Sequence, residues 1–410
     1  MPNRPCPVCL SQEREALYTQ VFSLPATHPM SAGYDLVCCS KCGMVYANVN
    51  MTEDYSQDSK YADSLTSTGA GSTPWDNKRL AVTAAYISTI VPPYARVLDV
   101  GCANGGLLAA LKDLGFTNLT GIDPSPACVA ETVKKGIYCH RGGLPDLSIN
   151  LEELLGEFDL IILSHVLEHL LNPGQAIRAL GRHHLSSRGL IYIEVPDAEH
   201  YKDMVISPYQ DINTEHINHF SDLGLRNLLS QSGYECLADG WKLIPASAQH
   251  ATPALYHVFR EDHLFTYRLK RDEDLKPAIV EYLNKSHRLL HNIDLHLCSN
   301  LAPDKPVILW GAGQLLHKLL SSTLLHSLRS GTVLHSLRIA AIVDSNPASG
   351  AMNLQQLRQL VYPNSSRDAD WSSYPIVICS ILHDQSILAS IKELGLPNPV
   401  IHLLPQKENQ

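Results

Sequence analysis

The sequence lacks several features that mark membrane, secreted and nucleic-acid-binding proteins. None of its apolar runs approaches the ~18 uninterrupted residues of a membrane-spanning helix, and residues 1–6 contain no apolar core of the kind that directs export. Basic residues are also scarce: 32 Lys and Arg face 41 Asp and Glu and give a formal net charge of −9, whereas a nucleic-acid surface requires a basic face. We therefore expect a cytoplasmic protein that acts on a small molecule, with neither nucleic acid nor a membrane as its partner.

The chain is long enough for more than one domain. It has 410 residues, and single hydrophobic cores stop growing near ~250–300 residues. Apolar residues make up 45% and charged residues 18% of the chain, which is typical of globular proteins. We expect an α/β protein with a doubly wound core and these parts: a cysteine-rich module (1–50), a linker or lid (51–76), the core domain (77–245), a helical connector (246–302) and a smaller C-terminal α/β domain (303–410).

The cysteines are concentrated near the N-terminus. Five of the eleven lie in the first 42 residues, where Cys6 and Cys9 form one Cys-x-x-Cys pair and Cys39 and Cys42 form another. Each pair can direct two thiolates at one ion, and two pairs complete the tetrahedral four-sulfur site that Zn²⁺ prefers. Cys38 is the alternative to Cys39 but lacks the spacing to Cys42. We expect a structural zinc site, with a chance cluster or a redox pair as the alternatives.

A glycine-rich turn marks the start of the core domain. Residues 96–100 are typical of a buried strand, and Gly101, Gly105 and Gly106 follow at once. Residues 107–114 then show helical periodicity, so the glycines lie where backbone and helix N-terminus can approach a ligand closely. The spacing differs from the dinucleotide fingerprint G-x-G-x-x-G, and the lysine of a P-loop is missing.

The pattern Asp-x-Gly-x-x-x-Gly, which begins at Asp99, resembles the first motif of the class I methyltransferases. In that family the turn holds the methionine part of S-adenosylmethionine. Residues 119–123 are a second expected strand, and it ends at Asp123, where a doubly wound fold places the acid that binds ribose hydroxyls. The resemblance implies S-adenosylmethionine as the cofactor, and the expected contacts are Asp99, Gly101, Asn104, Gly105, Asp123, Pro124, Leu144, Ser164 and His165.

A third segment agrees with this reading. Residues 158–163 are typical of a strand and lead into His165, Glu168 and His169, and class I methyltransferases usually have such a segment after their fourth strand. The same three residues match the H-x-x-E-H signature of inverted zinc proteases. That signature requires the interior of a helix, whereas here it begins at the end of a strand, so we favour the methyltransferase.

Residues 211–221 are the candidate catalytic segment. Glu215 and His216 are adjacent there, and a histidine tuned by a carboxylate is suited to general base catalysis. Two alternatives remain open at this point. The segment can serve capping and packing alone, or Glu215, His216 and His219 can converge on a metal ion.

The whole chain resembles the C-methyltransferases that act on nucleotide-linked keto-sugars. It shares their two cysteine pairs, their methyltransferase core, a Glu-His segment followed by Phe220-Ser221, and a smaller C-terminal α/β domain. The resemblance implies that His216 removes a proton beside a sugar ketone, with Glu215 next to it. The family has a tyrosine two positions before the glutamate, where this sequence has Asn213, whose amide can still donate a hydrogen bond to an oxyanion.

The C-terminal part repeats the strand-and-turn pattern. Strands are expected at residues 307–310, 339–344 and 376–380, and Gly311-x-Gly313 follows the first of them. We expect this unit to hold the diphosphate of a nucleotide-sugar, or else to serve as a scaffold. For the whole chain, the alternatives to C-methylation are O- or N-methylation of another metabolite and a cofactor-binding scaffold without turnover.

Overall fold

The computed structural model describes residues 4–24, 32–49, 74–143, 156–247, 249–262, 266–302, 305–322, 339–345, 351–361 and 371–405. Most of the expected linker and the expected cofactor contact Leu144 lie outside these ranges. The chain forms two compact units: the first comprises residues 1–19, 29–204 and 215–280, and the second comprises residues 20–28, 205–214 and 281–410.

A seven-stranded mixed sheet is the centre of the first unit. Its strand order is β10-β11-β8-β7-β4-β5-β6, and the bounds are β4 Arg96–Val100, β5 Asn118–Asp123, β6 Tyr138–Arg141, β7 Phe158–Ser164, β8 Leu185–Pro196, β10 Tyr234–Pro245 and β11 Ala251–Glu261. Strands β6, β5, β4, β7 and β8 are parallel, whereas β11 is antiparallel to both β8 and β10. This is the doubly wound α/β core that the sequence predicts.

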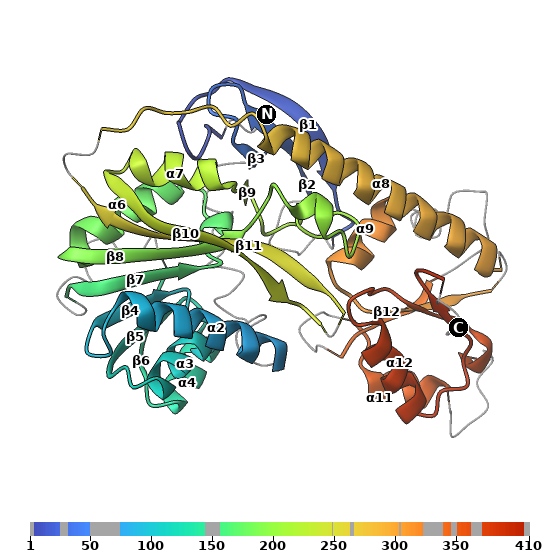
Figure 1. The fold of residues 1–410 in the computed structure, drawn as a ribbon. Coiled ribbons are helices and arrows are strands. Elements are labelled where there is room, and N and C mark those ends of the chain that lie inside the picture. Colours follow the sequence, from blue (N-terminus) through green and yellow to red (C-terminus); the bar gives the residue numbers. More distant parts are fainter. Residues whose placement is uncertain are drawn as a thin grey trace. The chain divides into compact units, whose positions relative to one another are not determined.

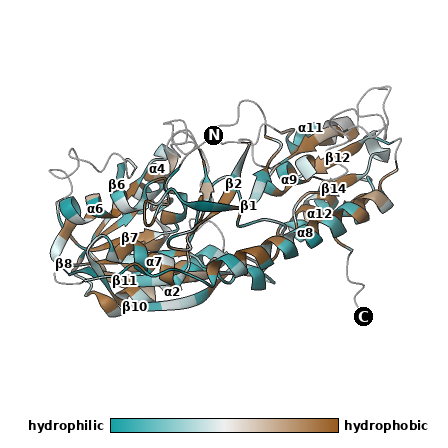
Figure 2. Cartoon of the chain, turned by 90° about the horizontal axis from the view of Figure 1, so that it is seen from above, coloured by the Kyte–Doolittle hydropathy of each residue, from teal (hydrophilic) through white to brown (hydrophobic). Residues whose placement is uncertain are grey.

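Helices cover both faces of this sheet (Figure 1). Residues of β4 alternate between two cores: Val97 packs with α2 (Pro74–Ile90) and α3 (Gly106–Asp113), and Leu98 packs with α6 (Pro173–His184) and α7 (Asp222–Ser230). Strand β7 is buried on both faces, and Figure 2 shows it in the hydrophobic colour. Helix α4 (Pro126–Lys134) follows β5 and begins at Ser125, whose hydroxyl accepts a hydrogen bond from the Cys128 amide.

A second, smaller sheet of the same unit contains Cys38 and Cys39, with the other N-terminal cysteines in the turns beside it. Its order is β1-β2-β3-β9, with β1 Arg14–Val21, β2 Gly33–Cys39, β3 Val45–Asn48 and β9 Asn218–His219. Strand β9 lies within the predicted catalytic segment, just after His216, and pairs with β3, with Val45 opposite His219 and Tyr46 opposite Asn218. The cysteine-rich segment and the segment after His216 are therefore parts of one sheet.

The second unit contains a parallel sheet of order β13-β12-β14-β15. Its elements are β12 Val307–Trp310, α9 Gln314–Ser322, β13 Ile339–Val343, α11 Leu354–Val361, β14 Ile376–Ile378, α12 Asp384–Glu393 and β15 Val400–His402. Strands β12, β13 and β14 coincide with the three strands expected in the C-terminal part. Helix α8, Leu275–Asn300, precedes this sheet and is banded in hydrophilic and hydrophobic colours in Figure 2.

The expected helical connector over 246–302 is helical only in part. Among the described residues of this range, Ala251–Glu261 form β11 and Leu275–Asn300 form a helix. Strand β11 is fixed by long-range pairing, because Leu255 lies opposite Val195 of β8 and opposite Trp241 of β10. Within the described ranges, no helix is both long and apolar enough to cross a membrane.

Candidate active site

The strand order of the central sheet places a cavity at the carboxyl ends of β4, β5 and β7. The chain winds outward from β4 in one direction through β5 and β6, and from β7 in the other through β8. Open α/β sheets bind ligands in the crevice outside such a reversal. A cavity of about 500 Å³ lies there, called the central cavity below, and Asp99, Gly101, Asp123, Ser164 and His165 are among its lining residues.

The turn after β4 has the backbone geometry that its glycines predict. Gly101 and Gly105 have φ angles of 74° and 69°, in the left-handed region that favours glycine. Ala103 shares this region with a φ of 48°. Its amide donates a 2.8 Å hydrogen bond to Asp123 Oδ2, and the Ser125 amide donates one of 2.9 Å to Oδ1. The Asp123 carboxylate is thus held by two backbone amides where β5 ends.

The lining of the central cavity contains four acidic side chains. Asp76, Asp99, Asp123 and Glu215 line it together with one arginine, Arg79, and three histidines. Burial raises the pKa of Asp99 to about 8, and the nearby charge of Asp123 contributes to the rise. A cationic ligand would relieve this repulsion, and S-adenosylmethionine carries its positive charge on the sulfonium and the amino group.

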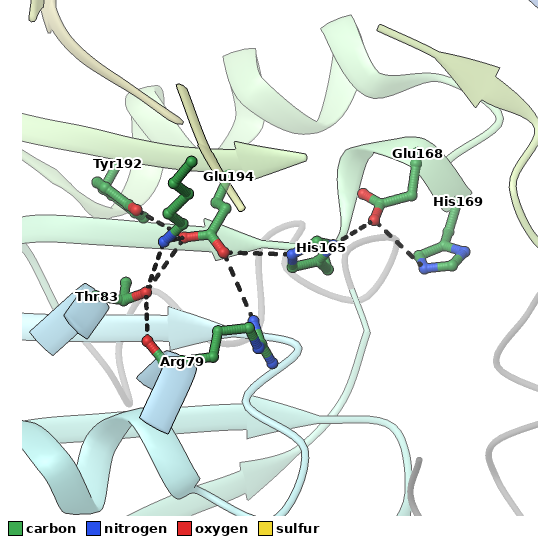
Figure 3. A network of polar contacts seen from close by, with 8 residues as sticks. Arg79, Thr83, His165, Glu168, His169, Tyr192 and Glu194 are labelled. Carbon is green, nitrogen blue, oxygen red and sulfur yellow. Dashed lines mark hydrogen bonds and ion pairs between the residues drawn. The ribbon is translucent and has the colours of Figure 1, made fainter. Parts of the chain in front are cut away.

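A buried carboxylate near the end of β8, Glu194, contacts two lining residues of the central cavity, Arg79 and His165 (Figure 3). The Tyr192 hydroxyl donates to Glu194 Oε2 at 2.7 Å, and Lys242 Nζ donates to the same oxygen at 2.6 Å. Arg79 Nη1 lies 3.6 Å from Oε1, and His165 Nε2 lies 3.3 Å from it. Burial alone would raise the pKa of Glu194, but His165 and the charge of Lys242 hold it well below its usual range.

His165 links Glu194 to a second buried acid, Glu168. His165 Nδ1 lies 3.2 Å from Glu168 Oε1, and this contact is also drawn in Figure 3. Burial opposes ionisation of Glu168. The contact with His165 outweighs this effect and lowers the pKa of Glu168 to about 2. The pKa of His165 is raised by its two carboxylate neighbours, which outweigh the opposing effect of burial. His165 also has a φ of 57°, so the chain turns sharply where β7 ends.

The predicted base His216 lines the central cavity together with Glu215 and His169. The rings of His216 and His169 meet edge to face, with centroids 5.0 Å apart. His169 Nδ1 lies 3.1 Å from the Glu215 carbonyl oxygen, and because a carbonyl only accepts, this nitrogen carries the proton. Burial, reinforced by the neighbouring His169, lowers the pKa of His216 to about 4. His216 is therefore neutral at physiological pH and able to accept a proton.

The other members of the predicted catalytic segment lie elsewhere. Asn213 belongs to the second unit, and its amide donates to the Gln210 carbonyl at 2.9 Å. His219 is fully buried in β9. Among the described residues, Glu215, His216 and His219 do not form a metal-binding group, whereas ligand atoms of Glu168, His169 and His216 lie within 4.8 Å of one another and could hold an ion.

Two further expectations bear on the strand-to-helix turn and on the protease motif. Pro124 lines the central cavity, but Asn104 and Gly105 are not among the residues lining it. Gly105 shapes the turn instead, since a Cβ at this position would lie 2.7 Å from Thr132 side-chain atoms. The H-x-x-E-H residues occupy the end of β7 and a single 3₁₀ turn, Leu167–His169, and this is not the helix interior that a zinc protease requires.

The N-terminal cysteines converge as a four-sulfur group. The sulfurs of Cys6 and Cys42 are 3.5 Å apart, as are those of Cys9 and Cys39, and all four lie within 4.8 Å of one another. Tetrahedral Zn–S bonds of ~2.3 Å place sulfurs about 3.8 Å apart, so these positions are compatible with one metal ion. Cys38 is not part of the group; its thiol contacts the Gly43 carbonyl, and burial raises its pKa to about 11.

Several residues of the site were missed from the sequence. Arg79 and Asp76 lie on α2, and their helix shows no motif of its own. His169 was recognised only as part of the H-x-x-E-H pattern, and Lys242 comes from β10, which was not predicted as a strand. Arg79 and Lys242 are charged residues on otherwise apolar faces of a helix and a strand. This was the one signal in the sequence that could have identified them.

Comparison with known proteins identifies the class of the core. Residues 75–239 match a protein family described as a methyltransferase domain. The matched range covers β4 to β8. It also includes Asp99, Asp123 and His216. Residues 75–239 are therefore a methyltransferase domain, and the prediction of an S-adenosylmethionine-dependent methyltransferase is confirmed at this level.

Curated relatives match short stretches of this chain. Human EEF1A lysine methyltransferase 2 is 37% identical over 65 residues, which are 16% of this chain and 26% of that protein. Ubiquinone biosynthesis O-methyltransferase of Dechloromonas aromatica is 40% identical over 94 residues, which are 21% of this chain and 38% of that protein. The chain thus spans about a quarter to two fifths of the relatives it matches, and their acceptors, to judge from their names, differ from each other.

Parts of this chain align with solved structures of methyltransferases at low identity and low TM-scores. Magnesium protoporphyrin IX methyltransferase from Synechocystis PCC 6803, with bound S-adenosylhomocysteine, aligns with a TM-score of 0.36 and 15% identity over 46% of this chain and 84% of its own. The Burkholderia thailandensis 1,6-didemethyltoxoflavin-N1-methyltransferase aligns with a TM-score of 0.38 and 16% identity over 53% of this chain and 95% of its own. Neither the methylated atom nor the acceptor follows from resemblance at this level.

Proposed function

We propose that this chain transfers the methyl group of S-adenosylmethionine to a carbon atom of a small molecule, a nucleotide-linked keto-sugar, with His216 as the base. One observation carries the proposal: a neutral, half-buried histidine lines the same cavity as the strand-end acids and the glycine turn of a methyltransferase domain. A base beside an electrophilic methyl donor is what the methylation of a carbon acid needs.

The central cavity suits the cofactor by its position in the sheet and by its charge. The backbone around Gly101 would hold the methionine part, and Asp123, at the end of the second strand, would accept hydrogen bonds from the ribose hydroxyls. The acidic lining complements the positive charge of the ligand. When bound, the cofactor supplies an electrophilic methyl group, so the protein itself has to generate and orient the nucleophile.

His216 generates that nucleophile. A ring nitrogen of His216 takes the proton from the carbon next to the ketone, and the C–H electron pair moves into the enolate. With the cofactor bound, the enolate carbon would be the nucleophile that accepts its methyl group, and the thioether would be the leaving group. Orientation of the two reactants contributes as much as about 7–11 kcal/mol of barrier reduction in the best cases. The oxyanion role of Asn213 stays a prediction.

Two features outside the cavity support the choice of acceptor class. The second unit carries a strand-to-glycine turn at Gly311, with a φ of 107°, and its Ala312 amide donates to Asp344 Oδ2 at 2.6 Å. This arrangement is similar to that of the cofactor turn, and we propose that it serves the nucleotide part of the acceptor. The four N-terminal cysteines would hold a structural Zn²⁺, whose closed tetrahedral site leaves no position for a substrate.

Methylation of a hydroxyl oxygen is the second candidate function. The match to the D. aromatica O-methyltransferase favours it, because its 40% identity over 94 residues exceeds the 37% of the human relative. In this case His216 would remove a proton from a hydroxyl group, and no carbon acid would take part.

Proton exchange separates the two candidates. The protein is incubated in D₂O with candidate nucleotide-linked keto-sugars, with and without cofactor, and the substrates are analysed by mass spectrometry and NMR. For C-methylation we expect deuterium at the carbon next to the ketone and a gain of one methyl group. Methylation without exchange under any condition would favour the hydroxyl acceptor, and neither reaction with any keto-sugar would refute the proposed acceptor.

The His216→Ala variant tests the base directly. Its methylation rate should fall by about 10²–10⁴-fold, the usual contribution of a positioned general base. Exchange should be lost, while cofactor affinity measured by calorimetry stays near that of the wild type. His287→Ala, which removes an exposed histidine of α8, is the matched control and should retain full activity. Near-normal turnover of His216→Ala would refute the base assignment and leave His169 or Glu215 as candidates.

A further inference from the structure

Arg4 stands at the beginning of the cysteine-rich segment, and its side chain is completely buried. Its guanidinium makes five hydrogen bonds to three separate segments of the first unit. Nη1 donates at 3.2 Å to the carbonyls of Ala47 and Ile217, and Nη2 donates to the Leu170 carbonyl at 3.0 Å, the Leu171 carbonyl at 2.8 Å and Asn218 Oδ1 at 2.7 Å.

Asn218 extends these links between the same segments. While its Oδ1 accepts from Arg4, its Nδ2 donates to the carbonyls of Leu167 at 2.8 Å and Leu170 at 2.7 Å. The neighbouring Ile217 amide donates to the Glu168 carbonyl at 2.9 Å. The segments 167–171 and 217–218, which are far apart in sequence, are therefore joined by the Arg4 guanidinium and the Asn218 amide.

These two segments carry the histidines of the central cavity. His169 lies inside the first segment, and His216 directly precedes the second. Their rings meet 5.0 Å apart, and the Glu215 carbonyl accepts from His169 Nδ1. A change in the spacing of the two segments would therefore alter the position of His216 relative to His169 and the cavity.

A buried guanidinium is strongly dependent on its acceptors. Removing its hydrogen bonds would leave a buried charge uncompensated, which is among the most costly changes in a protein interior. The carbonyls must therefore stay where the guanidinium can reach them. Five donors in a rigid planar fork can span several acceptors at once, whereas a lysine ammonium is a compact charge with three donors.

We propose that Arg4 is a positioning residue for methyl transfer, which locks the two segments that carry His169 and His216 in their reactive spacing. It touches neither substrate nor cofactor and acts through the backbone of both segments. The assignment rests on the proposed function in one respect only, namely that His216 is the base. It also connects the cysteine-rich segment to catalysis. Arg4 and Ala47 belong to that segment, and both donate a hydrogen bond to the Ile217 carbonyl.

Amide hydrogen exchange and kinetics on the full-length, zinc-loaded protein test this proposal. In Arg4→Ala and Arg4→Lys we expect exchange of the amides of residues 167–171 and 215–219 to accelerate about tenfold or more, while residues 97–123 keep wild-type protection. The turnover number should fall about 10–100-fold, since small misplacements of a catalytic group have effects of this size. The Michaelis constant, the cofactor affinity and the zinc content should stay near wild-type values. Arg188→Ala, which removes an exposed arginine of β8, is the control and should change none of these.

Each remaining outcome decides the question. Unchanged exchange in both segments would overturn the proposal, even if no acceptor is methylated, because exchange does not depend on activity. Faster exchange with full turnover would overturn the catalytic part. Should Arg4→Ala lose cofactor binding as well, Asn218→Ala provides the second test, since it removes the amide shared by both segments. Loss of cofactor binding in that variant too would identify Arg4 as a residue of global stability and overturn the positioning role.

Discussion

The ionisation of Asp99 should make cofactor binding depend on pH. Asp99 is almost completely buried at the end of β4, and burial together with Asp123 raises its pKa to about 8, against the opposing charge of Arg79. Without a ligand the carboxyl group is therefore mostly protonated at neutral pH. A cationic cofactor favours the ionised form, so binding should release a proton and strengthen as the pH rises.

The size of the effect follows from the pKa. If only ionised Asp99 supports tight binding, affinity is reduced by a factor of about 100 near pH 6, about 10 near pH 7 and about 2 near pH 8. The dissociation constant for S-adenosylmethionine should thus fall about 50-fold between about pH 6 and pH 8, which corresponds to about 2.3 kcal/mol. Above about pH 9 the dependence on this group should vanish.

Calorimetry can measure both the affinity and the protons released. Titrations in two buffers of different ionisation enthalpy should show close to one proton released per cofactor near pH 7. Asp99→Asn should bind more weakly at high pH and lack this proton release, and the variant also corrects for titration of the cofactor's own amino group. Equal pH dependence in wild type and Asp99→Asn would refute the reasoning, because another group would then control binding.

Other predictions address the metal, the ribose contact and the packing. Cys9→Ser should lower the zinc content, measured by mass spectrometry of the purified protein, from one ion per chain, without loss of cofactor affinity; unchanged zinc would refute the site. Asp123→Ala should weaken calorimetric binding of S-adenosylmethionine by about 1.5–3 kcal/mol, as expected for a lost charge-assisted acceptor. Glu194→Gln should lower the free energy of unfolding in urea by about 3–5 kcal/mol, because Lys242 loses its buried counter-charge. Gly121→Ala should cost about 1–3 kcal/mol in the same assay, since the added Cβ would lie 2.7 Å from Cys102 Sγ.

The parts of the site on parallel strands could be predicted from local sequence. Asp99 and Asp123 each end an apolar run, and the carboxyl ends of parallel strands meet at one edge of a sheet. Both residues therefore line one cavity, although they lie 24 positions apart in the sequence. The turn at Gly101 was predictable for a similar reason, because the positive φ that it needs restricts the residue type.

The antiparallel part of the sheet could not be predicted in this way. Residues 246–261 contain apolar residues compatible with a helix, and only their pairing with β8, about sixty residues earlier, fixes them as a strand. Lys242 reaches Glu194 only after this pairing has formed. Long-range pairing overrides a weak local preference for helix or strand in such segments. The contact between Lys242 and Glu194 therefore could not be predicted from local sequence.

Arg4 is the clearest example of a residue whose role could not be predicted from local sequence. From the sequence it is a polar residue in front of the first cysteine pair, and it resembles an ordinary surface arginine. Its role depends on acceptors that are 43 positions or more away, four of which are backbone carbonyls that any residue type would provide. Backbone acceptors leave no pattern of side chains, so no motif could have identified them. The catalytic segment itself was recognisable because His216 and Glu215 are chemically distinctive, but its position is set by an arginine that carries no such mark.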